Sequence, residues 1–213
     1  MPETSIDPAV ASLLREAQTW HLIGRLLERP RESWYEDVNG LAGGMDDAEL
    51  RDVAGLARNA NERRYLAAFG PSGVVSPREV AHCGMRDPGQ LLAELNTNYE
   101  MFGFRPRMED TIDHVAVETD FVAYLRFKEA FALSQGETEK AEVTKEAATR
   151  FIDEHLREMG EPIADRLEES AEPYLARAAR ALAKRVGKPT HDGAPNKVLW
   201  LDHDDEGMTC GDG

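Results

Sequence analysis

A single long helical segment, residues 110–133, constrains the fold of this chain more than any other feature. Its apolar side chains recur three or four residues apart, which is the spacing of one helical turn. Asp110 stands where an N-cap belongs, and Asp113 would then lie in the first turn, near the positive end of the helix dipole. The apolar positions cover more than one face, and such a helix is surrounded by other helices. The segment therefore predicts a bundle built around it.

The rest of the chain also shows helical spacing, and no part of it alternates between polar and apolar residues with the period of a strand. We therefore expect an all-α, single-domain helical bundle over residues 1–187. Gly160 and Pro162 should separate the last two helices. The expected helices lie at about 8–29, 34–39, 48–56, 62–69, 88–102, 110–133, 138–159 and 163–186.

Two segments depart from this pattern. Residues 70–90 are rich in Gly and Pro, which predicts a hinge between an N-terminal and a C-terminal group of helices. This arrangement would permit a monomer to exchange one half with a second copy and form a minor domain-swapped dimer. Residues 188–213 have the composition of an acidic tail, flexible or docked through the apolar run 198–201.

The charge of the chain limits its partners. Forty acidic residues against 25 basic ones leave a formal net charge of −15, which argues against nucleic acid and favours a basic peptide or protein, or simply solubility. No segment is apolar enough to cross a bilayer, and no export signal is visible, so we expect a cytoplasmic protein without membrane insertion. Cys83 and Cys210 show no metal-ligand spacing and are typical of cytosolic thiols.

An ordered set of short motifs gives the chain a resemblance to a known family. Pro106, Asp113-His114 and Glu118, followed by Phe121 and Leu125, resemble the signature helix of the TorD/DmsD/NarJ family. These proteins are cytoplasmic chaperones for molybdenum-containing oxidoreductases. The similarity extends over roughly residues 13–186. Flanking matches are Tyr65-Leu66-Ala67-Ala68-Phe69-Gly70-Pro71, Ser76-Pro77, Leu92, Tyr99, Phe102, Phe151, His155-Leu156, Tyr174-Leu175 and Leu182.

The resemblance implies a function. The protein would bind the twin-arginine leader and the immature catalytic subunit of a molybdopterin oxidoreductase of the dimethyl sulfoxide reductase superfamily, and assist cofactor insertion before export. It would be no enzyme and would hold no cofactor or metal of its own. It would bind guanine nucleotide at most weakly, since the sequence shows no phosphate-binding loop. The implied client-binding residues are Asp113, His114, Glu118, Phe121, Tyr65, Leu66, Phe69, Pro77 and Pro106.

Other interpretations of the same residues stay open. Asp113, His114 and Glu118 have a spacing at which a metal-dependent enzyme could bind zinc or iron. Asp113 and His114 could equally be a capping carboxylate beside a hydrogen-bonded histidine. A third interpretation is an assembly adaptor that binds the mature part of the client instead of its leader.

Overall fold

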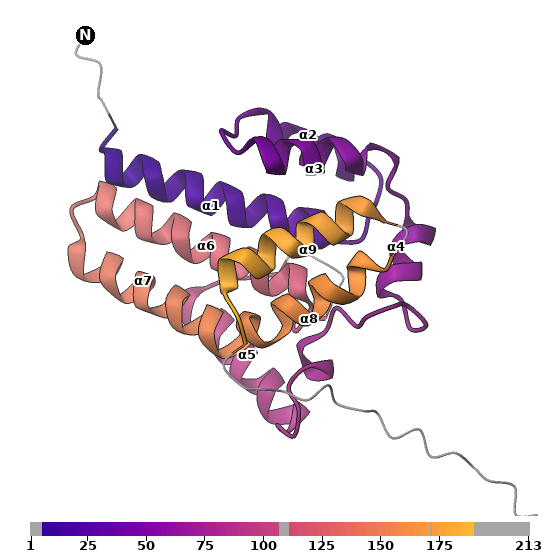
Figure 1. Cartoon of the computed structure of the whole chain (residues 1–213). Coiled ribbons are helices and arrows are strands. Elements are labelled where there is room, and N and C mark those ends of the chain that lie inside the picture. The colour runs from indigo at the N-terminus through magenta and orange to yellow at the C-terminus, as the bar shows by residue number, and fades with distance from the viewer. Residues whose placement is uncertain (1–5, 107–110, 171, 190–213) are drawn as a thin grey trace, which may run out of the picture.

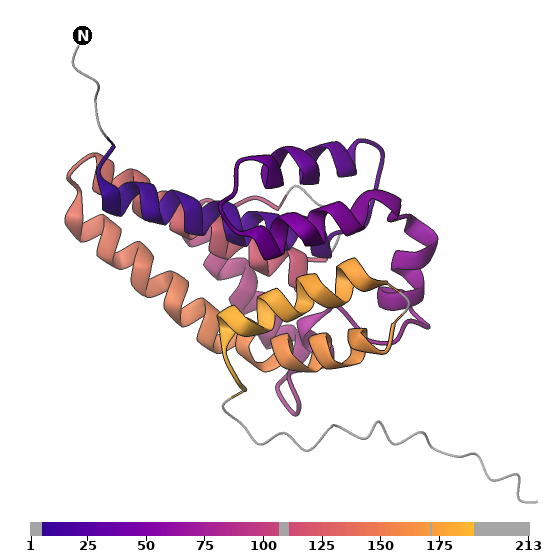
Figure 2. The ribbon, with the colours of Figure 1, turned by 45° about the horizontal axis from the view of Figure 1, so that its top comes forward.

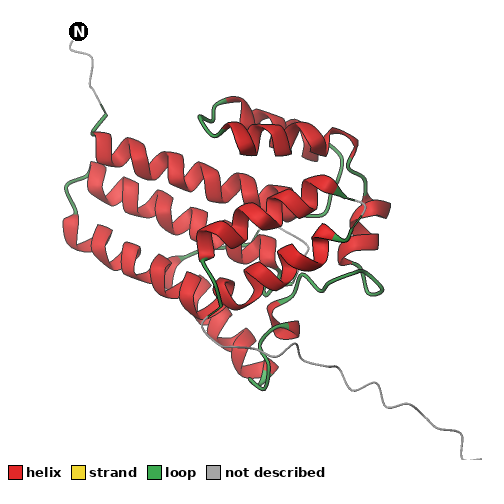
Figure 3. Ribbon diagram, viewed as in Figure 1, coloured by secondary structure: helices red, strands yellow, loops and turns green. Residues whose placement is uncertain are grey.

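The computed structural model describes residues 6–106, 111–170 and 172–189, and all regular secondary structure in these ranges is helical (Figure 3). The prediction of an all-α bundle is confirmed. In chain order the helices are α1 (Pro8–Leu27), α2 (Trp34–Gly43), α3 (Ala48–Leu56), α4 (Glu62–Phe69), α5 (Pro88–Phe102), α6 (Val115–Ser134), α7 (Thr138–Phe151), α8 (Arg157–Glu168) and α9 (Pro173–Val186). Short 3-10 turns lie at Ala57–Asn59 (η1) and Glu79–Ala81 (η2), and a π-turn at Ile152–Leu156 (η3) joins α7 to α8.

Helix α6 lies at the centre of the bundle. Figures 1 and 2 show it between α1 and α7, while α8 and α9 pair beside it, and α9 also contacts α1 and α3. Val115, Val122 and Leu125 of α6 are fully buried. Gly24 allows α1 to approach closely, because a Cβ there would stand 3.2 Å from the Ala116 carbonyl oxygen of α6. The central position predicted from its apolar faces is therefore confirmed.

Local capping signals placed several helix starts correctly. The carboxylates of Asp7, Asp47 and Asp87 each accept a hydrogen bond from a backbone N–H in the first turn of α1, α3 and α5, at 2.7, 3.0 and 2.8 Å. Satisfying these otherwise unpaired donors stabilises the start of a helix. Helices α1, α5 and α9 also carry proline at the first position after the cap.

The predicted start of the central helix was wrong. Helix α6 begins at Val115 with His114 as its N-cap, so Asp113 precedes the helix, while Asp110 lies outside the described residues. The reason is a tertiary contact. Ile112 and Asp113 form a turn, and the chain then pairs with residues 77–79. The Val115 N–H donates to the Pro77 carbonyl oxygen, and the Glu79 N–H donates to that of Asp113, each at 2.8 Å.

The predicted break at Gly160 and Pro162 was also wrong, because α8 continues through both residues to Glu168. Gly160 does not end a helix but lies where α8 crosses α9. A Cβ at this position would stand 2.6 Å from the Val186 side chain of α9. The absence of a side chain therefore brings α8 and α9 together.

Two predicted segments have different outcomes. Residues 70–90 are indeed irregular apart from η2 and the start of α5, but their action as a hinge stays a prediction. The tail beyond residue 189, with the run 198–201 and Cys210, lies outside the described residues. Among the helices that the structure describes, none has the length and apolar character needed to span a membrane.

Candidate functional site

His114 connects three helices at the start of α6. Its Nδ1 accepts a hydrogen bond from the Ala116 N–H at 3.1 Å, so in the neutral ring the proton is on Nε2. That Nε2 lies 2.9 Å from the Tyr65 hydroxyl of α4, which in turn lies 3.4 Å from the Leu27 carbonyl oxygen of α1. The ring of Phe69 meets the imidazole edge-on at 6.2 Å. The structure thus brings together three of the predicted residues, Tyr65, Phe69 and His114.

Asp113 is fully buried and pairs with an arginine from the Gly- and Pro-rich segment. Nε of Arg78 lies 3.0 and 3.1 Å from the two carboxylate oxygens of Asp113, and the Val80 N–H lies 3.5 Å from one of them. The buried Pro77 is part of the same extended pairing. This contact fastens residues 76–82 to the start of α6.

A second buried pair lies beside the first. Nδ1 of His155, in η3, is 3.1 Å from each carboxylate oxygen of Glu79, and both residues are buried. Arg86 approaches Glu79 to 3.8 Å. Sequence reasoning missed Glu79 and His155 as functional candidates, because 76 residues separate them and no spacing along the chain signals their contact.

Glu118 is fully buried next to these pairs, and neither of its carboxylate oxygens accepts or donates a hydrogen bond among the described residues. Burial, together with the negative charges of Glu79 and Asp113, raises the pKa of Glu118 well above its ordinary value. The side chain therefore keeps its proton to higher pH than a free glutamate does. The three carboxyl groups and the side chains that pair with them form what we call the polar cluster: Arg78, Glu79, Arg86, Asp113, Glu118 and His155.

Phe121 belongs to the core beneath this cluster. Its ring packs against Tyr99, Phe104 and Phe151, with centroid distances of 4.8, 5.2 and 4.7 Å. Of the predicted site residues, only Leu66 is exposed and only Pro106 is half-buried. The other predicted side chains are buried, so a client could touch them only after the structure around them had changed.

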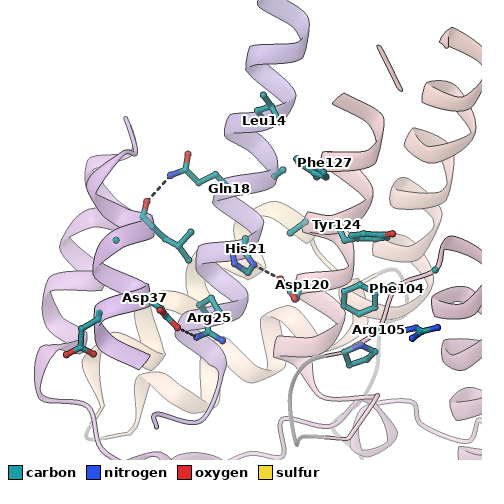
Figure 4. Close-up of a pocket in the computed structure, with 17 residues that line it drawn as sticks. Leu14, Gln18, His21, Arg25, Asp37, Phe104, Arg105, Asp120, Tyr124 and Phe127 are labelled. Carbon is teal, nitrogen blue, oxygen red and sulfur yellow. Dashed lines mark hydrogen bonds and ion pairs between the residues drawn. The ribbon is translucent and has the colours of Figure 1, made fainter. Parts of the chain in front are cut away.

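An open groove of about 1270 Å³ lies on another side of α6 (Figure 4). Its walls come from α1, α2, α6 and residues 103–106, and it includes Pro106. The floor is mostly apolar, and Phe127 is 53% exposed. The apolar lining residues are Leu14, Ala17, Leu41, Phe104, Pro106, Ala123, Tyr124 and Phe127.

Charged groups gather at one end of this groove. Nδ1 of His21 lies 2.5 Å from a carboxylate oxygen of Asp120, and Arg25 pairs with Asp37 at 2.7 Å (Figure 4). Glu36 and Arg105 also line the groove, and neither forms an ion pair within the described part of the chain. Apart from Pro106, sequence reasoning missed this groove, because His21 and Asp120 are 99 residues apart.

The residues of the proposed metal site are engaged in other contacts. The Asp113 carboxylate accepts a hydrogen bond from Arg78, and Nδ1 of His114 accepts one from the backbone N–H of Ala116. In the ranges that the structure describes, no three His, Cys, Asp or Glu side chains are grouped so as to hold a metal ion. The geometry thus gives the metal-enzyme interpretation no support.

An all-helical bundle with an open, largely apolar groove defines a protein with a surface suited to a polypeptide segment. The family model described as nitrate reductase delta subunit matches residues 30–165, more than half of the chain. The protein belongs to this family, whose members are chaperones for the maturation of molybdoenzymes, and the resemblance to the TorD/DmsD/NarJ proteins is confirmed. A search of curated proteins gave no match.

Proposed function

We propose that the protein is a cytoplasmic chaperone dedicated to one molybdopterin oxidoreductase. It binds the twin-arginine leader and the immature catalytic subunit of that client and delays export until the molybdenum cofactor has been inserted. It catalyses no reaction and holds no cofactor itself. The open groove between α1, α2 and α6 is the observation that supports this proposal most directly.

The groove offers what a twin-arginine leader requires. Guanidinium groups bind carboxylates through two directed hydrogen bonds. Glu36 stands at one end without an ion pair among the described residues, and Asp37 and Asp120 there would have to exchange Arg25 and His21 for the leader's arginines. The apolar run of a leader would bind along Leu14 and Phe127, as an amphipathic segment binds in an apolar groove. The net charge of −15 would speed the encounter with a basic peptide.

The predicted site residues take two roles in this proposal. Leu66 and Pro106 reach the surface and can touch the client directly. The buried ones, Asp113, His114, Glu118, Phe121, Tyr65, Phe69 and Pro77, hold the start of α6 and residues 76–82 in place. Asp120, on the second turn of α6, depends on that placement for its position in the groove.

Calorimetry with a synthetic twin-arginine leader tests the proposal. We expect micromolar or tighter binding to the full chain, and weaker binding when both arginines are replaced by alanine. The loss should be about 2–5 kcal/mol if the arginines become buried against carboxylates, and much less if they stay at the rim. Equal binding of the two peptides would contradict leader recognition and favour the adaptor that binds the mature part of the client.

Weak binding of guanine nucleotide is a lesser proposal that rests on the family resemblance alone. Titration of the full chain with guanosine triphosphate tests it. Heat of binding that survives an excess of adenosine triphosphate would support a guanine-selective site.

A further inference from the structure

The acidic tail contains one segment of different chemistry. Residues 190–213 contain five aspartates and four glycines, yet Val198, Leu199, Trp200 and Leu201 follow one another. Large apolar side chains gain free energy when they leave water, so such a run favours a covered position. The groove beside α6 is an uncovered apolar surface in the same chain, with Phe127 53% exposed.

The last helix ends beside the loop that joins α2 to α3. At the end of α9, Arg185 lies 3.3 Å from Asp47 and Lys184 lies 2.8 Å from Glu49, so this end rests on the start of α3. Gly44, shortly before Asp47, adjoins the side chain of Gln18, which lines the groove. After α9 the described chain runs past the junction of α7 and α8 (Figure 1). The roughly nine residues from Pro189 to Val198 can span about 30 Å when extended.

The charges on either side of the run match groups that the groove leaves unpaired. Lys197 precedes the run, and Glu36 of α2 forms no ion pair within the described ranges. Asp202 and further acidic residues follow it, and Arg105 is likewise without an ion pair there. A segment lying across the groove from α2 toward residues 103–106 would place each charge near its opposite.

We propose that the run Val198–Leu201 of the protein's own tail occupies the groove between α1, α2 and α6 when no client is bound. Docking by itself does not depend on the proposed function. Its consequence does depend on it, because a leader that binds the same groove must displace the tail. The apparent affinity of the protein for the leader then equals the intrinsic affinity multiplied by the fraction of chains in which the groove is free.

Trp200 provides the test, in the full-length protein and without any client peptide. Trp20 and Trp34 are buried, so the difference between the emission of the wild type and that of Trp200→Phe isolates the tail residue. We expect this emission to be blue-shifted and quenched by acrylamide several-fold less than in the free peptide of residues 190–213. Phe127→Ser should raise quenching to that of the free peptide.

The matched control is Phe131→Ser. Phe131 lies one turn further along the same helix and is 58% exposed, but it does not line the groove. Its substitution should leave the shielding of Trp200 unchanged. Equal effects of the two substitutions, or a Trp200 as accessible as in the free peptide, would overturn docking in the groove. Shielding that grows with protein concentration would overturn it too, since the occupant would then be a second copy.

The competition has its own measurement. Leu201→Asp should weaken docking and raise the affinity for a twin-arginine leader several-fold in calorimetry. Unchanged affinity in a variant whose Trp200 has become accessible would overturn the competition. Absence of leader binding in every variant would instead contradict the proposed function and leave the fluorescence result as it stands.

Discussion

Arg78 and Asp113 are 35 residues apart in sequence, yet Nε of the arginine contacts both carboxylate oxygens of the aspartate. Together with the contact between Glu79 and His155, this pair fastens the Gly- and Pro-rich segment to the body of the bundle. Asp113 and His114 are thus both buried and engaged in contacts within the bundle. The open groove lies elsewhere on α6.

Removing Arg78 and removing Asp113 should lower the free energy of unfolding by different amounts. Asp113→Ala leaves a guanidinium that is 41% exposed and can be hydrated, so we expect a loss of about 1.5–3 kcal/mol. Arg78→Ala leaves a fully buried carboxylate without its cation and should cost more, about 3–5 kcal/mol. Urea denaturation of both variants measures the difference. A cost for Asp113→Ala near 1 kcal/mol, equal to that of Arg78→Ala, would instead indicate an ordinary capping residue.

The double variant Asp113→Ala, His114→Ala separates an anchoring role from contact with the client. If the two residues only anchor the fold, the fall in melting temperature should account for all of the lost client activity. The melting temperature is measured on the purified variant, and client activity in a strain that carries it. A variant that melts like the wild type but leaves the client inactive and unexported would show contact with the client, and Glu118→Ala should then give a smaller loss of the same kind.

Glu118→Gln should change the pH dependence of stability. The pKa of Glu118 is raised in the folded chain from its ordinary value near 4.5, so its contribution to stability is complete below that value and falls as the pH rises above it. Glutamine has no proton to lose. The stability of Glu118→Gln relative to the wild type should thus increase between about pH 5 and pH 8 in urea denaturation. An unchanged difference would mean that Glu118 is already ionised at the lower pH.

Glu36 should contribute to leader binding through its unpaired carboxylate in the groove. Because Glu36 is exposed, Glu36→Gln should weaken the binding of a twin-arginine peptide by only about 0.2–1 kcal/mol, and by less in high salt. Glu32→Gln is the control, as Glu32 is also exposed and does not line the groove. Calorimetry at two salt concentrations compares them. Equal effects would indicate long-range attraction by the net charge alone.

The protein should be mostly monomeric, with a minor dimer that exchanges halves through residues 70–90. A swapped dimer keeps the contacts of the monomer, so Arg78→Ala should hardly change the dimer fraction. It should speed interconversion, because the anchor that must open is weaker. Light scattering after chromatography gives the fraction, and re-injection of the isolated dimer gives the rate. A single obligate tetramer would contradict this expectation.

The sequence alone determined the all-α class, the order of the helices and most of their starts, because these depend on side-chain periodicity and on caps such as Asp7 and Asp47. It also identified the family, since the ordered motifs are read along the chain. Within the candidate site it identified Asp113, His114 and Glu118, but as the polar end of a groove. They are buried instead.

Only the tertiary structure decided where α6 begins and what Gly160 does. The contact of Val115 with Pro77 moves the start past Asp113, and the crossing with Val186 keeps α8 continuous through Gly160. The tertiary structure also brought Glu79 to His155, and it brought His21 to Asp120 in the groove. The physical reason is common to all four contacts. Each joins residues far apart in sequence, and neither helical spacing nor a capping signal reaches beyond a few turns.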